Sequence, residues 1–442
     1  MKLVLITPKS IFFSTNNSVS NFFKNSFTAT ADNIVMSRYA YWTGGNPGLL
    51  IVAALTPQNF EVDFIDENYE QIDFDVRYDI VAISAMTQQA TRAYEIADEF
   101  RKRHIKVVLG GIHATVLPEE AKEHADSVVI GEAENTWPEF IRDLVKGETK
   151  PFYKSTIPVD LTKVPVPKYE LLKKYDYKMV WVQTTRGCPR DCEFCVASNV
   201  YGKKYRHKTI GQVLEEIRYI RGLWSDPVIN FTDDNMFVDR AYSSELVQQL
   251  ARTGLRWTAQ TDVSVAENDS FLDLLQKSNC ILLFIGFETL AGGGTLDRHG
   301  WKQSRIKRYP EIIKKIQSRG IGILGAFIVG LDEDDDSAFS SLSNFIIDNC
   351  LYTAQISALT PLPGTRLRER LQKEERILPG GWEKYTFLDV NFVPKRMKPE
   401  ELQNGLLEIY ERVYSKEARL AVMSHFKDIY AKLHERSAHV GW

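Results

Sequence analysis

Two successive series of short apolar segments, each alternating with helical patterns, constrain the fold of this chain more than any other feature. The first series falls within residues 1–148 and the second within residues 179–368. Parallel strands need a long crossover connection, usually a helix, so this alternation is typical of α/β domains. A chain of 442 residues is also too long for one ordinary domain. We therefore predict two α/β domains.

The first series predicts a doubly wound, Rossmann-like domain. Its predicted strands are the apolar runs at residues 2–7, 62–66, 80–84, 107–109 and 127–130. An insertion at residues 10–45 breaks the alternation and contains the aromatic residues Phe22, Phe23, Phe27, Tyr39, Tyr41 and Trp42. These side chains predict either an apolar lid over a cofactor or substrate, or ordinary core packing.

The second series predicts a partial (β/α)6 barrel. Its six apolar runs lie at residues 179–184, 228–232, 256–260, 282–287, 323–329 and 354–359. Residues 149–178 carry Pro151, Pro158, Pro165 and Pro167, and we predict an extended linker there. Residues 369–442 have a charged, helical pattern and are predicted to form a packed C-terminal region.

Three cysteines lie close together directly after the first strand of the second series. Cys188, Cys192 and Cys195 have the spacing C-x3-C-x2-C. Three thiolates can bind three irons of a cubane [4Fe-4S] cluster and leave the fourth iron open, unlike the four-thiolate clusters of ferredoxins. A structural zinc ion would need four ligands, and His207 is the nearest other candidate. The spacing therefore favours a cluster whose open iron the amino and carboxylate groups of S-adenosylmethionine (SAM) can chelate.

The cysteine motif resembles the signature of the radical SAM superfamily, in which an aromatic residue precedes the last cysteine, as Phe194 does here. The resemblance covers residues 179–365 and implies that an electron from the cluster cleaves SAM to a 5'-deoxyadenosyl radical. It also implies SAM contacts at successive strand ends, from Asp233, Asp234, Gln260, Glu288 and Ile328. The alternative is that the polar members only cap strands or helices.

Small and polar residues follow the predicted strands of the first domain, where α/β sheets bind ligands. Glycines there let backbone N–H groups approach a phosphate or amide, and hydroxyls can hydrogen-bond a nucleotide tail. The candidate residues are Ser84, Thr87, Gly110, Gly111, His113, Gly131 and Glu132. A scaffold without a ligand is the alternative.

Placed before a radical SAM barrel, this domain resembles the cobalamin-binding domain of the cobalamin-dependent radical SAM enzymes. The Asp-x-His-x-x-Gly pattern that supplies a histidine to cobalt in other cobalamin proteins is missing from it. The resemblance therefore implies cobalamin without a lower histidine ligand, or no cobalamin at all.

The domain pair implies a C-methyltransferase that methylates an unactivated carbon. Cobalamin-assisted cyclisation, oxidation or rearrangement without methyl transfer is the alternative reaction. Residues 1–187 contain no cysteine, which disfavours a methylthiotransferase because that activity needs a second cluster. The alternative from a different class of function is a non-catalytic cobalamin or redox sensor that does not cleave SAM.

The overall charge narrows the expected partners. The chain has 55 basic and 58 acidic residues, so no general basic field favours nucleic acid. We expect a small-molecule or lipid substrate and an electron donor such as flavodoxin or ferredoxin. No apolar run is long enough to span a bilayer, and nothing at the N-terminus is typical of a signal peptide. Clustered cysteines suit a reducing compartment, which predicts a cytoplasmic location.

Overall fold

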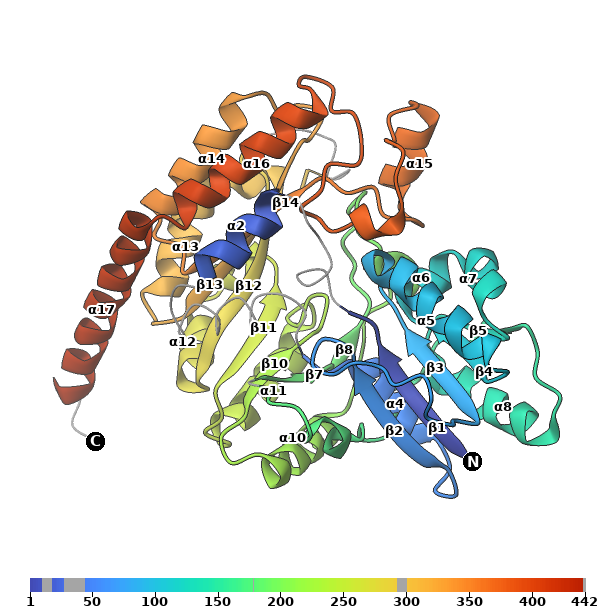
Figure 1. Cartoon of the computed structure of the whole chain (residues 1–442). Helices are drawn as coiled ribbons and strands as arrows, with labels where there is room; N and C mark the ends of the chain where they lie inside the picture. Colours follow the sequence, from blue (N-terminus) through green and yellow to red (C-terminus); the bar gives the residue numbers. More distant parts are fainter. Residues whose placement is uncertain (10–17, 28–43, 178, 292–299, 440–442) are drawn as a thin grey trace.

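The computed structural model describes residues 1–9, 18–27, 44–177, 179–291 and 300–439. Within this part of the chain, two six-stranded parallel sheets lie beside each other, with helices of the C-terminal region over the second sheet (Figure 1). A short two-stranded ribbon accompanies the second sheet. The predicted fold class, a Rossmann-like domain followed by a partial barrel and a helical C-terminal region, is confirmed.

The first sheet has the strand order β2-β1-β3-β4-β5-β6, and all neighbours are parallel. Its strands are β1 (Lys2–Thr7), β2 (Glu61–Asp66), β3 (Ile80–Ser84), β4 (Lys106–Gly110), β5 (Ser127–Ile130) and β6 (Phe152–Lys154). Strand β6 falls within residues 149–178, where an extended linker is expected. It joins the sheet because Tyr153 buries its ring against Phe140 and its hydroxyl donates to Asp143.

Both faces of the first sheet are covered by helices. These are α4 (Pro47–Leu55), α5 (Ala90–Lys102), α6 (Gly111–Val116), α7 (Pro118–His124) and α8 (Ala133–Lys146). Successive side chains of a strand point to opposite faces, so Leu3 and Leu5 share a core with α4 and α8, whereas Val4 and Ile6 share one with α5. The short helix α6 is not evident from the sequence, since it has only six residues.

The second sheet has the order β14-β13-β12-β11-β10-β7, again with all neighbours parallel. Its strands are β7 (Met179–Val182), β10 (Val228–Phe231), β11 (Trp257–Thr261), β12 (Cys280–Glu288), β13 (Gly322–Val329) and β14 (Thr353–Ala358). The helices between them are α10 (Ile210–Leu223), α11 (Arg240–Ala251), α12 (Asp269–Lys277), α13 (Tyr309–Gln317) and α14 (Ser337–Asp348). Strands β7 and β14 do not pair with each other, so the barrel is open.

The C-terminal region covers the β14 edge of the barrel. It contains α15 (Arg366–Lys373), α16 (Pro399–Val413) and α17 (Lys416–His439). Two tyrosine hydroxyls from this region take the place of a further strand. Tyr410 bonds both backbone groups of Ile356, and Tyr414 bonds both backbone groups of Ala354. An edge strand is thereby closed to other chains.

Helix α2 (Ser18–Phe27) of the N-terminal insertion packs on α16, beside the second sheet and away from β1 (Figure 1). The ring of Phe23 lies 4.9 Å from that of Tyr410, and Phe23 is buried. Of the two interpretations of these aromatic residues, core packing therefore holds for Phe23. Tyr39, Tyr41, Trp42 and the side chain of Phe27 lie outside the described residues. In the described ranges, no helix combines the length and apolarity that a membrane crossing requires.

Candidate active site

The three cysteines lie on a loop, residues 187–196, that we call the cluster loop. It directly follows β8 (Thr185–Arg186) and precedes β9 (Arg206–His207), and these two strands pair as the short antiparallel ribbon. Gly187 turns the chain with φ +89°, and a Cβ there would lie 2.3 Å from the carbonyl oxygen of Lys204. Only glycine fits this turn, which brings the first cysteine directly out of the ribbon.

Backbone amides surround the cysteine sulfurs. The N–H of Arg190 donates to Cys188, and the N–H groups of Ala197 and Ser198 donate to Cys195. Burial raises the pKa of both thiols to about 11, so the chain without iron holds them protonated. Binding of iron therefore releases these protons, and the amides remain to stabilise sulfur charge. This donor set fits an iron–sulfur cluster.

The kind of metal group also depends on how close together its ligands lie. Among the described residues, no three His, Cys, Asp or Glu side chains gather closely enough to hold one metal ion. Each cysteine of a cubane binds a different iron, so its sulfurs stand farther apart than the ligands of a single ion. The assignment to a cubane therefore rests on the C-x3-C-x2-C spacing and on the amide donors at the sulfurs.

Asp233 and Asp234 follow β10 and have different environments. Asp233 is fully buried, and its carboxylate accepts from the N–H groups of Thr184 and Thr185 at 2.7 Å and from the Thr184 hydroxyl at 2.5 Å. It therefore holds the chain just before the cluster loop. Asp234 Oδ2 is buried without a hydrogen-bond partner in the part of the chain that is described. Burial, and then the charge of Asp233, raises the pKa of Asp234 to about 6.

A buried, unpaired carboxylate oxygen near the cysteines is an acceptor for a cationic ligand. Asp234 is close enough to Cys188 and Cys195 for its charge to raise the pKa of both thiols. The amino group of SAM carries the matching positive charge. Of the two candidates, Asp234 is thus the one with capacity left for a ligand.

Glu288 and Ile328 lie on the same cavity, of about 230 Å³, at the ends of β12 and β13. Glu288 has φ +65°, an unfavourable conformation for this residue type, and Lys302 donates to its Oε1 at 2.6 Å. Gln260 lies near the end of β11 and does not line this cavity. Phe194 is half-buried and packs on the main core beside the cluster loop.

The candidate residues of the first domain collect at the carboxyl edge of its sheet. Ser84 ends β3 and accepts from the side chain of Asn46 at 3.3 Å. Gly111 has φ +90° and packs so closely on residues 84 and 85 that a Cβ would lie within 2.8 Å of them, whereas a Cβ on Gly131 meets no described atom within 4 Å. Space beside Gly131 suits the approach of a cofactor. Thr87 starts the next helical turn and is buried, and Gly110 ends β4.

His113 and Glu132 already have protein partners. His113 is buried, its Nε2 lies 3.2 Å from Glu120, and burial lowers its pKa, so its ring is neutral. Its Nδ1 has no partner among the described residues. Glu132 forms ion pairs with Arg186 and Arg206. These two residues therefore form the wall of the site, and the open glycine edge is better suited to contact a cofactor.

Several charged residues that hold the site were not predicted from the sequence. Arg366 of α15 pairs with Asp191 at 3.0 Å, and the backbone N–H of Leu367 donates to the carbonyl of Glu193 at 3.2 Å. On the other side, Arg190 pairs with Asp262 at 2.9 Å. In the sequence, only the acidic residues between the cysteines, Asp191 and Glu193, hint at these contacts, because nothing nearby in the chain identifies their partners.

Comparisons with known proteins agree with this architecture. Family models match in chain order: a B12 binding domain at residues 36–141, the radical SAM superfamily at 182–346 and a domain of unknown function at 365–440. A bacteriochlorophyllide d C-12(1)-methyltransferase from Chlorobaculum tepidum is 32% identical over 376 residues, which are 83% of this chain and 82% of that protein. The chain belongs to the cobalamin-dependent radical SAM methyltransferases.

Other relatives of this methyltransferase family extend the comparison. A hopanoid C-2 methylase from Rhodopseudomonas palustris is 28% identical over 343 residues, covering 75% of this chain and 65% of that protein. Among solved structures, the cobalamin-dependent radical enzyme OxsB, with aqua-cobalamin and SAM bound, has a TM-score of 0.67 at 14% identity. The match covers 99% of this chain and 72% of OxsB. The matched B12 binding domain and radical SAM models give this methyltransferase its cofactors, which are a [4Fe-4S] cluster, SAM and cobalamin.

Proposed function

We propose that this methyltransferase transfers a methyl group to a carbon atom of an apolar, polycyclic small molecule. The observation that carries the proposal is a contact between its two domains. Glu132, just after β5, pairs at 2.7 Å with Arg186, just before the cluster loop. The carboxyl edges of the two sheets therefore adjoin, and a substrate between them can reach both cofactor sites.

Specific residues of the barrel account for SAM and cluster binding in this proposal. Cys188, Cys192 and Cys195 hold the cluster. Asp234 accepts the amino group of SAM, because its Oδ2 lacks any other described partner. Glu288 and Ile328 contact the adenosyl part in their shared cavity. When bound, the cluster supplies the electron that cleaves SAM, and cobalamin supplies the methyl group.

In the first domain, Ser84, Gly110 and Gly131 provide backbone and hydroxyl contacts for cobalamin. The open space at Gly131 supports this role. Burial lowers the pKa of His113 and keeps its ring neutral, with Nε2 against Glu120, so His113 serves as a wall and not as a cobalt ligand. This agrees with the missing histidine motif.

The substrate class rests on the curated relatives. Bacteriochlorophyllide is the substrate named for the relative at 32% identity, and hopanoid is named for the one at 28%. Both substrates are rigid, largely apolar ring systems. We therefore propose a tetrapyrrole or polycyclic lipid substrate. A small electron carrier such as flavodoxin or ferredoxin supplies the reducing electron, and the reducing environment that the cysteines need places the enzyme in the cytoplasm.

An anaerobic reconstitution tests the proposal. The full chain is loaded with iron, sulfide, SAM and methylcobalamin and incubated under reducing conditions with a lipid and pigment extract from cells lacking the protein. We expect uptake of cobalamin, formation of 5'-deoxyadenosine and S-adenosylhomocysteine, and a product heavier by one CH2 group. Variants with Cys192→Ala should form neither nucleoside product.

Two results would contradict the proposal. Failure of the loaded chain to bind cobalamin would remove the methyl carrier. A product of unchanged carbon count, with 5'-deoxyadenosine but no S-adenosylhomocysteine, would assign the chain to radical cyclisation or rearrangement instead.

A further inference from the structure

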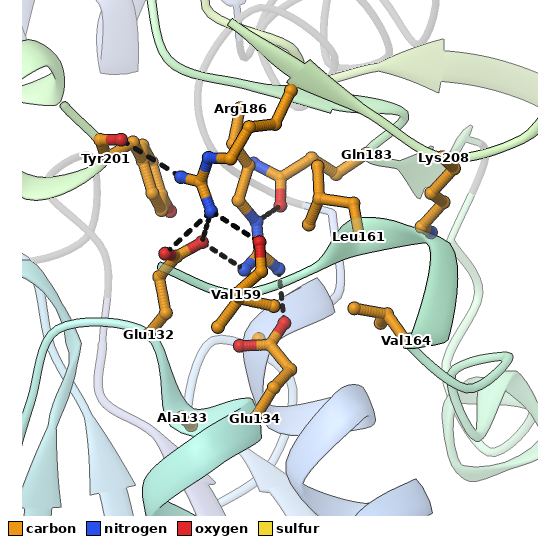
Figure 2. Close-up of polar contacts among 12 residues, drawn as sticks. Glu132, Ala133, Glu134, Val159, Leu161, Val164, Gln183, Arg186, Tyr201 and Lys208 are labelled. Carbon is orange, nitrogen blue, oxygen red and sulfur yellow. Dashed lines mark hydrogen bonds and ion pairs between the residues drawn. The ribbon is translucent and has the colours of Figure 1, made fainter. Parts of the chain in front are cut away.

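Arg186 is buried between two carboxylates of the other domain. Its Nη1 lies 2.7 Å from Glu132 Oε1, and its Nη2 lies 2.6 Å from Glu134 Oε1. The exposed fractions of the three side chains are 7%, 11% and 8%. The guanidinium Nε donates to Gln183, so every side of the group has a polar partner (Figure 2).

A second arginine completes the cluster. Arg206, on β9, pairs with Glu132 Oε2 at 2.9 Å and also donates to the backbone carbonyls of Val159 and Tyr201. We call Glu132, Glu134, Arg186 and Arg206 the charge bridge. Its two positive and two negative charges balance within one buried group. Figure 2 shows Glu132 and Glu134 of the first domain converging on Arg186 of the second.

Net stability is a weak explanation for such a group. Desolvation of buried ions offsets most of their attraction, and apolar side chains of similar volume often serve a fold equally well. Buried ion pairs do fix the relative orientation of the segments that carry them. A buried ion that loses its partner is strongly disfavoured, so the two segments stay in the one arrangement that keeps the pair. A planar guanidinium that meets two carboxylates fixes both distance and angle.

The position of the charge bridge shows what it orients. Glu132 directly follows Gly131, at the open edge proposed for cobalamin, and Arg186 directly precedes Gly187 and Cys188. We propose that Arg186 is a positioning residue that fixes the cobalamin edge of the first domain relative to the cluster loop. This inference rests on the proposed function, since it sets the separation between the methyl carrier and the radical-forming centre.

The first test uses the full chain without cofactors. Arg186→Lys keeps the charge but loses the planar two-point contact, and Glu134→Gln removes one of the two negative charges that face Arg186. Glu216→Gln is the matched control, because Glu216 forms a buried pair with Lys208 at 2.6 Å and accepts from Tyr169, and neither partner belongs to the charge bridge. We expect backbone amides of residues 131–134 and 184–188 to exchange hydrogen about tenfold faster in the first two variants than in the control.

The second test measures positioning itself. With cob(II)alamin and the reduced cluster both bound, the magnetic interaction between their electron spins reports their separation by electron paramagnetic resonance. We expect a weaker or broadened interaction in Arg186→Lys and Glu134→Gln, while the spectrum of each centre measured alone stays the same. Glu216→Gln should keep the wild-type interaction, even though it lowers stability.

Unchanged exchange in both loops, or an unchanged spin interaction in both variants, would overturn the positioning role. If the wild-type chain binds no cobalamin, the proposed function fails, whereas the exchange measurement on the cofactor-free chain still decides whether the charge bridge couples the two loops.

Discussion

Arg370 of α15 holds Glu193 of the cluster loop by two hydrogen bonds, from Nε to Oε1 at 2.9 Å and from Nη2 to Oε2 at 3.2 Å. The same arginine also pairs with Asp332, in the loop after β13, at 2.8 Å. Helix α15 begins the segment matched to a domain of unknown function. Part of what that segment does is thus to hold the loop that carries the cysteines.

The substitution Arg370→Lys should make the cluster less stable. Lysine keeps the positive charge but loses the two-point contact, so the cluster loop is held less firmly. We expect the reconstituted cluster of this variant to break down several-fold faster than that of the wild type, in air or with an iron chelator. The decay of the visible absorbance of the cluster measures this rate. Arg412→Lys, on α16 and in contact with α14, is the control and should leave the decay unchanged.

The substitution Asp234→Asn should stabilise the cofactor-free chain while weakening SAM binding. Burial and the Asp233 charge raise the pKa of Asp234 to about 6, above the ordinary value of 3.8. A carboxyl whose pKa is raised on folding binds its proton more tightly in the folded state, so its ionised form disfavours folding. Stability therefore falls as pH rises from about 4 to about 6.

Asparagine at position 234 has no ionised form, so it removes this pH-dependent loss of stability. We expect Asp234→Asn to increase the free energy of unfolding by about 1–2 kcal/mol at pH 7.5 and by almost nothing at pH 4. Denaturant unfolding of the two cofactor-free proteins across this pH range measures the difference. A constant difference at all pH values would show that the charge of Asp234 is not its source.

The tyrosines that cap β14 should contribute measurably to stability. The Tyr410 hydroxyl donates to the carbonyl of Ile356 at 2.6 Å and accepts from its N–H at 3.0 Å. Tyr410→Phe leaves both buried backbone groups without this partner, and we expect a loss of about 1–3 kcal/mol in the free energy of unfolding. Tyr219→Phe, which loses only an exposed bond to Glu170, should change stability by less than about 0.5 kcal/mol.

Glu288→Gln should weaken SAM binding with little effect on the cluster. The substitution removes the charge that pairs with Lys302 and alters the wall of the cavity at β12. We expect the Kd for SAM to rise about tenfold, as measured by calorimetry on the reconstituted protein. The surface variant Glu311→Gln, on α13, should bind SAM as the wild type does. Equal affinity in Glu288→Gln would remove Glu288 from the SAM site.

The sequence by itself determined the features that depend on local patterns. Alternating apolar runs and helical patterns predicted two parallel α/β sheets, because hydrophobic periodicity is set within each element. The spacing of Cys188, Cys192 and Cys195 predicted a three-thiolate loop at a strand end for the same reason. Both features follow from residues that are close in the chain.

Only the tertiary structure decided which distant residues meet. Asp233 and Asp234 are adjacent residues of the same type. Asp233 accepts hydrogen bonds from two backbone N–H groups, whereas Asp234 keeps an unpaired oxygen among the described residues. The contact of Arg186 with Glu132, and the packing of Phe23 on Tyr410, join residues far apart in the chain. Such pairings depend on how whole elements pack, and no local period or spacing encodes them.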